Sequence, residues 1–317
     1  MSRFTGWRNC GAMLVTACSL IACGIGGSGG GKRSEPAPPG STLPQLPGAP
    51  VMVNNVATDG MNWINYRRRL AGMPEMARTS TVATAAQAHS DYQKSNDIVT
   101  HDEIGGKPGF TGVDLKARLT AAGYPWDNTA YAGEVISATS SNSGFYMAEE
   151  LITAIYHRFV MFEPVFKEIG TGSATTKAGY TYFTANFAGK NGYGPGVGQG
   201  KIAVWPHDGQ SLVPPNFFSD FETPDPISGS NEVGYPISVH ADINMVVAVQ
   251  AFTLRARGTG ADLPVKLLVH ATDSETTASA AAIIPLSVLK AGTVYDVTFK
   301  GSAGGTAINK SWSFSTR

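Results

Sequence analysis

The 317-residue sequence contains only three cysteines, at positions 10, 18 and 23. All three lie at the N-terminus, so the rest of the chain has no disulfide and no cysteine nucleophile. The body of the protein must therefore be stabilised by burial of apolar side chains, and it is not a disulfide-rich secreted scaffold.

An excess of charge of one sign is also lacking, because 24 basic side chains are matched by 24 acidic ones. The longest basic run is Arg67-Arg68-Arg69, and no longer run or basic stripe is present, so the sequence predicts no nucleic-acid partner. Several enzyme motifs are missing as well. No Gly-x-Ser-x-Gly elbow joins a predicted strand to a predicted helix, no His-Glu-x-x-His occurs, and no Walker or dinucleotide fingerprint opens a helix after a strand.

The N-terminus does carry an apolar run, at residues 12–22, but it is shorter than the roughly 20 residues that a membrane-spanning helix needs. Arg3 and Arg8 precede the run, as in a secretory signal. The run ends in Leu20-Ile21-Ala22-Cys23, which resembles a bacterial lipobox. We expect a signal peptide over 1–23 and a lipid on Cys23; a generic signal that ends near a cysteine is the alternative.

Residues 24–53 are rich in glycine at their start and in proline further on. Such chain is flexible or extended and has too few apolar residues to fold, so it predicts a tether between anchor and domain. Gly24 follows Cys23, and in a bacterium with two membranes we expect sorting to the outer membrane.

Residues 54–192 have helical periodicity mixed with strand-like runs. The pattern predicts four helices, at 59–71, 80–92, 113–122 and 144–162. Strand-like runs lie at 132–138, 167–172 and 180–188. This half of the chain is therefore predicted to be α+β.

Glycine and proline cluster in residues 193–230, which predicts a linker with one strand-like run at 201–205. Beyond it, short strand-like runs separated by turn residues fill 231–317. Regular spacing of short strands predicts an all-β sandwich.

Five fragments of the first part, in order, resemble the CAP superfamily, the domain of cysteine-rich secretory proteins, in its bacterial branch. They are Asn65 to Met73, Ala85 to Tyr92, Thr100-His101-Asp102 with Arg118 to Tyr124, Ala132-Gly133-Glu134-Val135-Ile136, and Ala154 to Arg158 with Ile169 to Gly172. The resemblance implies a three-layer α-β-α sandwich over 54–192. Residues 231–317 are similar to an immunoglobulin-like (Ig-like) β module, on Val233 to Val239 and Ser311 to Phe314.

Domains of this family have a cleft lined by two histidines and two acids. The resemblance assigns His101, Glu134 and His157 to three of these positions. Two imidazoles and a carboxylate could bind a divalent cation such as Zn²⁺ or exchange protons near neutral pH. A structural alternative stays open, in which His101 and Glu134 bond to each other and hold loops in place.

The second acid of the family is missing, since Ala154 stands where it would lie. Glu150 is four residues earlier and seven before His157, and on one continuous helix it would share that residue's face. His89 is expected to be a helix-packing residue.

These features together predict a lipid-anchored protein exported to the cell envelope that binds a lipid, a protein or another envelope component through the cleft. One alternative is a metal-dependent or acid–base hydrolase that uses His101, Glu134 and His157. Another is a structural spacer or adhesion-type module in which the Ig-like part matters most.

Overall fold

The computed structural model describes residues 46–317. The predicted signal peptide, Cys23 and most of the predicted tether lie outside the described residues. Among the helices of residues 46–317, none combines the length and apolarity that a bilayer crossing requires.

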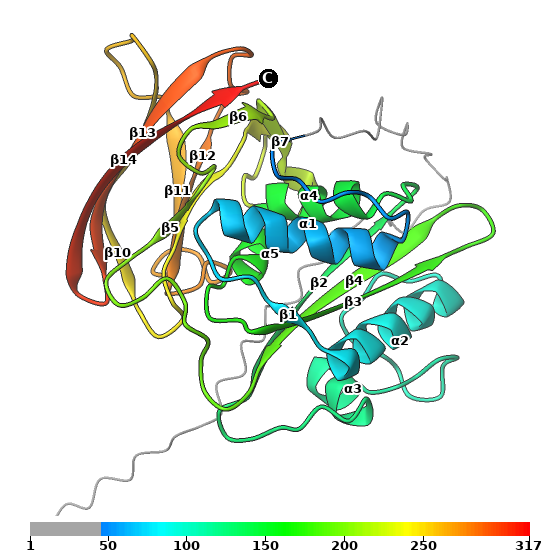
Figure 1. Ribbon diagram of the computed structural model, residues 1–317. Helices are drawn as coiled ribbons and strands as arrows, with labels where there is room; N and C mark the ends of the chain where they lie inside the picture. Colours follow the sequence, from blue (N-terminus) through cyan, green and yellow to red (C-terminus); the bar gives the residue numbers. More distant parts are fainter. Residues whose placement is uncertain (1–45) are drawn as a thin grey trace, which may run out of the picture.

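A four-stranded sheet forms the centre of the N-terminal part (Figure 1). Its strands, in spatial order, are β1 (Ala77–Arg78), β3 (Glu168–Thr175), β4 (Thr181–Gly189) and β2 (Tyr131–Thr139). The β1–β3 pair is parallel, and the other two pairs are antiparallel. Nearly every residue of β2 and β4 is buried, as expected for a sheet covered on both faces.

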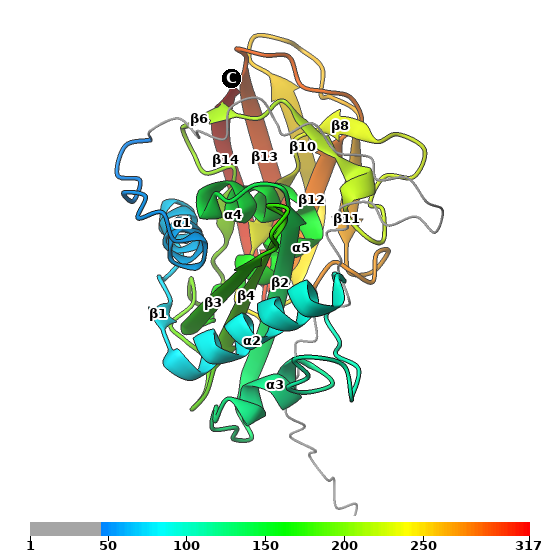
Figure 2. The ribbon, with the colours of Figure 1, turned by 90° about the vertical axis from the view of Figure 1, so that its right-hand side faces the viewer.

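Helices cover the two faces of this sheet (Figures 1 and 2). One face carries α2 (Ser80–Asn96) and α3 (Leu115–Ala121), whose Val82 and Leu119 pack with Ala132 of β2. The other carries the three helices α1 (Val56–Leu70), α4 (Gly144–Thr153) and α5 (Ile155–Met161). The predicted three-layer α-β-α sandwich is therefore confirmed.

Two glycines of β3 allow α2 to pack directly on the strand. A Cβ atom on Gly170 would lie 2.1 Å from the backbone nitrogen of Ala83, and one on Gly172 would lie 2.3 Å from the Cα of Gln87. The Gly-x-Gly pattern thus has a packing cause, because a larger residue at either position would push the helix away.

The helix predicted at 144–162 is two helices, which corrects the sequence-based prediction. The chain breaks at Ala154, whose φ of −69° and ψ of 118° are extended rather than helical. The break leaves the first N–H groups of α5 without intrahelical partners, and the carboxylate of Glu222, 67 residues after Ile155, accepts them. Glu150 and His157 therefore do not share the face of one continuous helix.

The C-terminal part contains two four-stranded sheets and is all-β, in agreement with the prediction. The first sheet has the order β10 (Val247–Ala256), β13 (Val294–Ala303), β14 (Thr306–Thr316) and β6 (Gln210–Val213). The second has the order β11 (Val265–Val269), β12 (Ala280–Pro285), β9 (Ile237–His240) and β5 (Ala203–Trp205). The strands β7 (Asn216–Phe218) and β8 (Glu232–Gly234) form a separate two-stranded sheet, and their Phe217 and Val233 share an apolar cluster with Leu268 of β11 and Ile284 of β12.

The segment predicted as a linker, 193–230, supplies β5, β6 and β7 to these sheets. Glycine and proline break the segment into short strands, but they do not prevent β5 from pairing with β9 or β6 with β14. Pairing partners so distant in the chain leave no local pattern in the sequence.

The two parts share one apolar core. Phe162 at the end of α5 meets Trp205 of β5 edge to face, with ring centroids 5.2 Å apart. The Trp205 indole donates to the Tyr235 hydroxyl at 2.9 Å, and Arg158 of α5 donates to the carbonyl of Pro236 at 2.8 Å. The α1–α4–α5 side of the sandwich is thus covered by the β part (Figure 1).

Candidate functional site

The structure brings together two of the predicted site residues, His101 and Glu134. Glu134 lies on β2 and, because side chains alternate along a strand, points toward α2 and α3 like Ala132. His101 lies in the segment between those helices, and its Nδ1 is 2.9 Å from Oε1 of Glu134. The His101 side chain is 14% exposed, whereas that of Glu134 is 3% exposed.

Arg118 of α3 binds Glu134 from the protein interior. Its Nη2 donates to both carboxylate oxygens, at 2.8 and 2.9 Å, and its Nη1 donates to the carbonyl of His101 at 2.7 Å. The side chain of Arg118 is fully buried. A charged guanidinium therefore neutralises Glu134 and fixes the backbone that carries His101.

The pKa of Glu134 depends on two opposing effects, burial and the neighbouring positive charges. Burial alone would raise it, but the charges of Arg118 and His89 and the hydrogen bond from His101 together outweigh burial. The pKa of Glu134 is therefore held well below its usual range. The group remains a carboxylate at neutral pH, which makes it a poor proton donor there.

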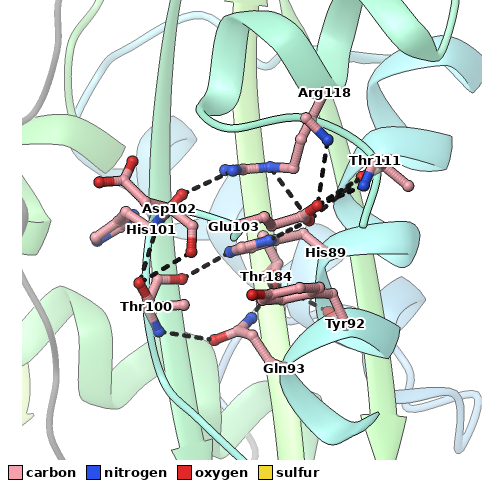
Figure 3. Close-up of polar contacts among 12 residues, drawn as sticks. His89, Tyr92, Gln93, Thr100, His101, Asp102, Glu103, Thr111, Arg118 and Thr184 are labelled. Atoms are coloured by element: carbon pink, nitrogen blue, oxygen red, sulfur yellow. Dashed lines mark hydrogen bonds and ion pairs between the residues drawn. The ribbon is translucent and has the colours of Figure 1, made fainter. Parts of the chain in front are cut away.

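A second buried pair adjoins the first, as Figure 3 shows for His89, Glu103 and Arg118. His89 Nδ1 is 2.9 Å from Oε1 of Glu103, and His89 Nε2 is 2.7 Å from the carbonyl oxygen of Thr100 and 3.9 Å from Oε1 of Glu134. A carbonyl and a carboxylate both accept hydrogen bonds, so each ring nitrogen of His89 faces an acceptor.

Glu103 fixes the loop that follows it. Its Oε2 accepts from the backbone N–H groups of Thr111 and Gly112, at 2.6 and 3.2 Å. Burial raises the pKa of Glu103, but the hydrogen bonds from His89 and Thr111 outweigh it and lower the pKa below its usual value. We call the five residues His89, His101, Glu103, Arg118 and Glu134 the buried network.

Sequence reasoning did not single out Glu103 and Arg118, and it treated His89 as a packing residue. His89 is a buried residue of α2, as expected, but both of its ring nitrogens also make polar contacts, one with Glu103 and one with the Thr100 carbonyl. The sequence did contain a hint of their role. Glu103 directly follows the family-like fragment Thr100-His101-Asp102, and Arg118 is the first residue of the fragment Arg118 to Tyr124.

The other two predicted site residues lie elsewhere. Glu150 is on α4 and accepts a hydrogen bond from the Ser137 hydroxyl at 3.3 Å. His157 is fully buried on α5, which lies on the opposite face of the sheet from α2 and α3, with its Nδ1 3.1 Å from Oε1 of Glu222. The contact partner of His157 is thus in the C-terminal part of the chain.

This arrangement does not fit the predicted Zn²⁺ site. Both oxygens of Glu134 already accept from the Arg118 cation, and His157 is bound to Glu222. Within residues 46–317, no three His, Cys, Asp or Glu side chains are grouped as metal ligands. The residues predicted as ligands therefore do not form a common metal site in this structure.

A groove of about 570 Å³ lies between α1 and α2 in the same domain. Thr171 of β3 also lines the groove, and its hydroxyl donates to the Ala57 carbonyl at 2.7 Å. Its lining is a mixture of hydroxyl, amide, charged and apolar side chains, which includes Thr58, Met61, Arg78, Thr84, Gln87 and Asp91.

Comparison with known proteins gives one family. The model of the cysteine-rich secretory protein family, named CAP, matches residues 61–187. No curated protein matches the chain.

Three solved bacterial structures are similar to part of the chain. An extracellular protein containing an SCP domain from Bacillus anthracis is 23% identical, with a TM-score of 0.37, over 44% of this chain and 45% of that one. An outer surface protein from Borrelia burgdorferi is 14% identical, with a TM-score of 0.34, over 41% and 90% of the two chains. A cysteine-rich secretory protein from Staphylococcus aureus is 17% identical, with a TM-score of 0.32, over 44% and 40%. The match therefore spans less than half of the Bacillus and Staphylococcus proteins.

Proposed function

Because residues 61–187 carry a CAP domain, we propose that this chain is an extracytoplasmic binding protein, held at the cell envelope by a lipid on Cys23. The charged start, the apolar run and Leu20-Ile21-Ala22-Cys23 support the export and the anchor. The binding role rests on the CAP domain, and the C-terminal all-β part acts as its Ig-like platform.

The groove between α1 and α2 is the observation that carries the binding role. Its volume of about 570 Å³ is in the range typical of small-molecule sites. Hydroxyl and amide groups of Thr58, Thr84 and Gln87 offer hydrogen bonds to a polar part of a ligand, while Met61 offers an apolar contact. This mixture suits an amphipathic envelope component such as a lipid headgroup with the start of its chains.

The contacts of Glu134 in the buried network argue against its use as the general acid or base of a hydrolase. A general acid or base must reach the proton that it transfers, and its pKa must lie near the working pH. Glu134 meets neither condition, since it is bonded to Arg118 and its pKa is lowered. The contacts of the buried network hold the loop after Glu103 and the backbone of His101 in place.

The test is native mass spectrometry of the protein extracted from its own membrane. We expect a co-purifying ligand, and we expect Ala88→Trp, which fills the groove, to lose it. Ser95→Trp is the matched control, because Ser95 is exposed on the same helix but does not line the groove. Retention of the ligand by Ala88→Trp would move the binding site away from the groove.

Two further variants separate the anchor from the hydrolase alternative. Cys23→Ser should move the protein from the membrane fraction to the soluble fraction. Turnover of an envelope substrate that His101→Ala abolishes, with folding intact, would contradict a pure binding role.

A further inference from the structure

The loop between α2 and α3 exposes several large apolar side chains to solvent. Ile104 is 61% exposed, Val113 is 56% exposed and Phe110 is 40% exposed. Ile98, two residues after the end of α2, is 41% exposed. We call residues 104–113 the apolar loop.

The backbone of the apolar loop is held by hydrogen bonds from the protein interior. At its neck the N–H of Glu103 donates to the Val113 carbonyl at 3.2 Å, and the N–H of Ile104 donates to the Tyr92 hydroxyl at 2.9 Å. The Glu103 side chain belongs to the buried network and bonds to Thr111 within the loop.

The turn of the loop is packed onto α2. The Asn96 side chain donates to the Pro108 carbonyl at 2.9 Å, and a Cβ atom on Gly109 would lie 3.3 Å from the Cα of Tyr92. Gly106 and Gly109 adopt φ values of 84° and 78°, which only glycine tolerates without strain. Gly106, Gly109 and Asn96 therefore favour the backbone conformation in which Ile104 and Phe110 are exposed.

Exposed apolar side chains held in one place mark an interaction surface. The apolar loop contains one charged residue, Lys107, and no acid; the acids Asp102 and Asp114 lie outside it, at its base. A cation among exposed apolar side chains complements a surface that is apolar beneath anionic headgroups.

We propose that the apolar loop is a membrane contact, in which Ile104 and Phe110 enter the bilayer surface and Lys107 binds lipid phosphate. This inference rests on the proposed anchoring at Cys23, which brings the domain within reach of the bilayer. The 30 residues of the predicted tether span at most about 100 Å, so the domain stays at a high effective concentration beside the membrane.

The size of the surface favours a bilayer over a protein. The few exposed apolar side chains of one short loop bury far less than the roughly 1,000 Å² of a stable protein interface. A weak bilayer contact suffices, because the lipid on Cys23 supplies the lasting attachment and the loop has only to set the orientation.

The experiment uses residues 24–317, which lack the predicted signal peptide and Cys23 and contain no cysteine. Binding is measured by flotation with vesicles of phosphatidylethanolamine and phosphatidylglycerol. We expect Ile104→Ser with Phe110→Ser to lower the partition coefficient about tenfold or more, since each buried apolar side chain contributes substantially.

The matched control is Val246→Ser with Leu286→Ser, two exposed apolar residues of the β part, 63% and 46% exposed. This pair should bind vesicles like the parent. Lys107→Glu should weaken binding to anionic vesicles and leave binding to purely zwitterionic vesicles unchanged. An environment-sensitive fluorophore on Phe110→Cys should shift to the blue with vesicles, and one on Leu286→Cys should not.

Equal vesicle binding by the parent and the loop variant, or no fluorophore shift at Phe110→Cys, overturns the proposal. Loss of binding to an envelope protein fraction without any vesicle binding also overturns it and identifies a protein as the occupant. Anchoring is scored separately, by membrane fractionation of the chain with Cys23 intact, so failure of the anchor and failure of the loop are distinguishable.

Discussion

The carboxylate of Glu222 and the imidazole of His157 form a buried contact of 3.1 Å between the two parts of the chain. The same carboxylate accepts the backbone N–H groups of Ile155 and Tyr156, at 2.9 and 2.7 Å. Glu222 therefore satisfies the start of α5 with a charge of the favourable sign for a helix N-terminus. A residue of the predicted linker thus completes a helix of the CAP domain.

Replacing Glu222 with alanine should lower the free energy of unfolding by about 3 kcal/mol, because it leaves buried N–H groups and the His157 ring without their acceptor. Glu222→Gln should cost less, since its amide oxygen still accepts. Urea denaturation measures both. Glu232→Ala is the control, because Glu232 is exposed and its loss should change stability little. An unchanged stability of Glu222→Ala would contradict the capping role.

Arg118→Met should destabilise the protein by about 3–5 kcal/mol, because it leaves Glu134 buried without its cation. The double variant Arg118→Met with Glu134→Gln should regain part of that loss, since no uncompensated charge then remains. A double-mutant cycle from thermal unfolding gives the coupling energy. A coupling energy near zero would show that the ion pair is not the reason for the burial of either residue.

Glu163 gives a pH dependence of the opposite kind to that of Glu134. Burial raises the pKa of Glu163 to about 8, against the hydrogen bonds from Val165 and Ile243. A carboxyl group whose pKa is raised on folding stabilises fully below its unfolded pKa, near 4.3, and loses that contribution as the pH rises through about 8.

Unfolding free energies measured from pH 5 to pH 9 should therefore fall by up to about 1.4 kcal/mol per pH unit between pH 5 and pH 8 from this group. Glu163→Gln should flatten that slope and be more stable than the parent at pH 9. Ser279, whose hydroxyl is 3.4 Å from Oε2 of Glu163, can accept from the new amide. Parallel pH profiles of the two proteins would contradict the raised pKa.

Gly170→Ala should cost about 1–3 kcal/mol, because its Cβ would overlap the backbone of Ala83 and separate α2 from β3. Gly105→Ala is the control, since a Cβ there has open space and the glycine has no positive φ. Thermal unfolding of both variants checks the pair. Equal melting temperatures would mean that α2 can shift on the sheet without cost.

The sequence predicted the fold well where the chemistry is local. Helical periodicity located α1 to α3, and the ordered family fragments identified the α-β-α sandwich. The resemblance also named His101 and Glu134, which the structure brings to 2.9 Å from each other. Both residues could be identified because each stands within a short fragment typical of the family, Thr100-His101-Asp102 and Ala132 to Ile136.

The rest depends on contacts between distant residues. The residues near Ala154 do not indicate that the helix breaks there. The start of α5 is stabilised by Glu222, which lies 67 residues after Ile155. Nothing in 201–205 reveals that β5 pairs with β9. Arg118 likewise becomes a partner of Glu134 only when α3 packs on β2, and a single sequence does not display such a pairing.

The shared core also sets an order of events during synthesis. The chain is made from its N-terminus, so α5 emerges more than 60 residues before Glu222, and Phe162 emerges before Trp205. Until the later residues arrive, the nascent CAP domain has an uncapped helix and an uncovered apolar face. The final packing of this domain therefore forms only after the β part has been made, and a ribosome that pauses within 193–230 would hold an incompletely packed chain with exposed apolar surface.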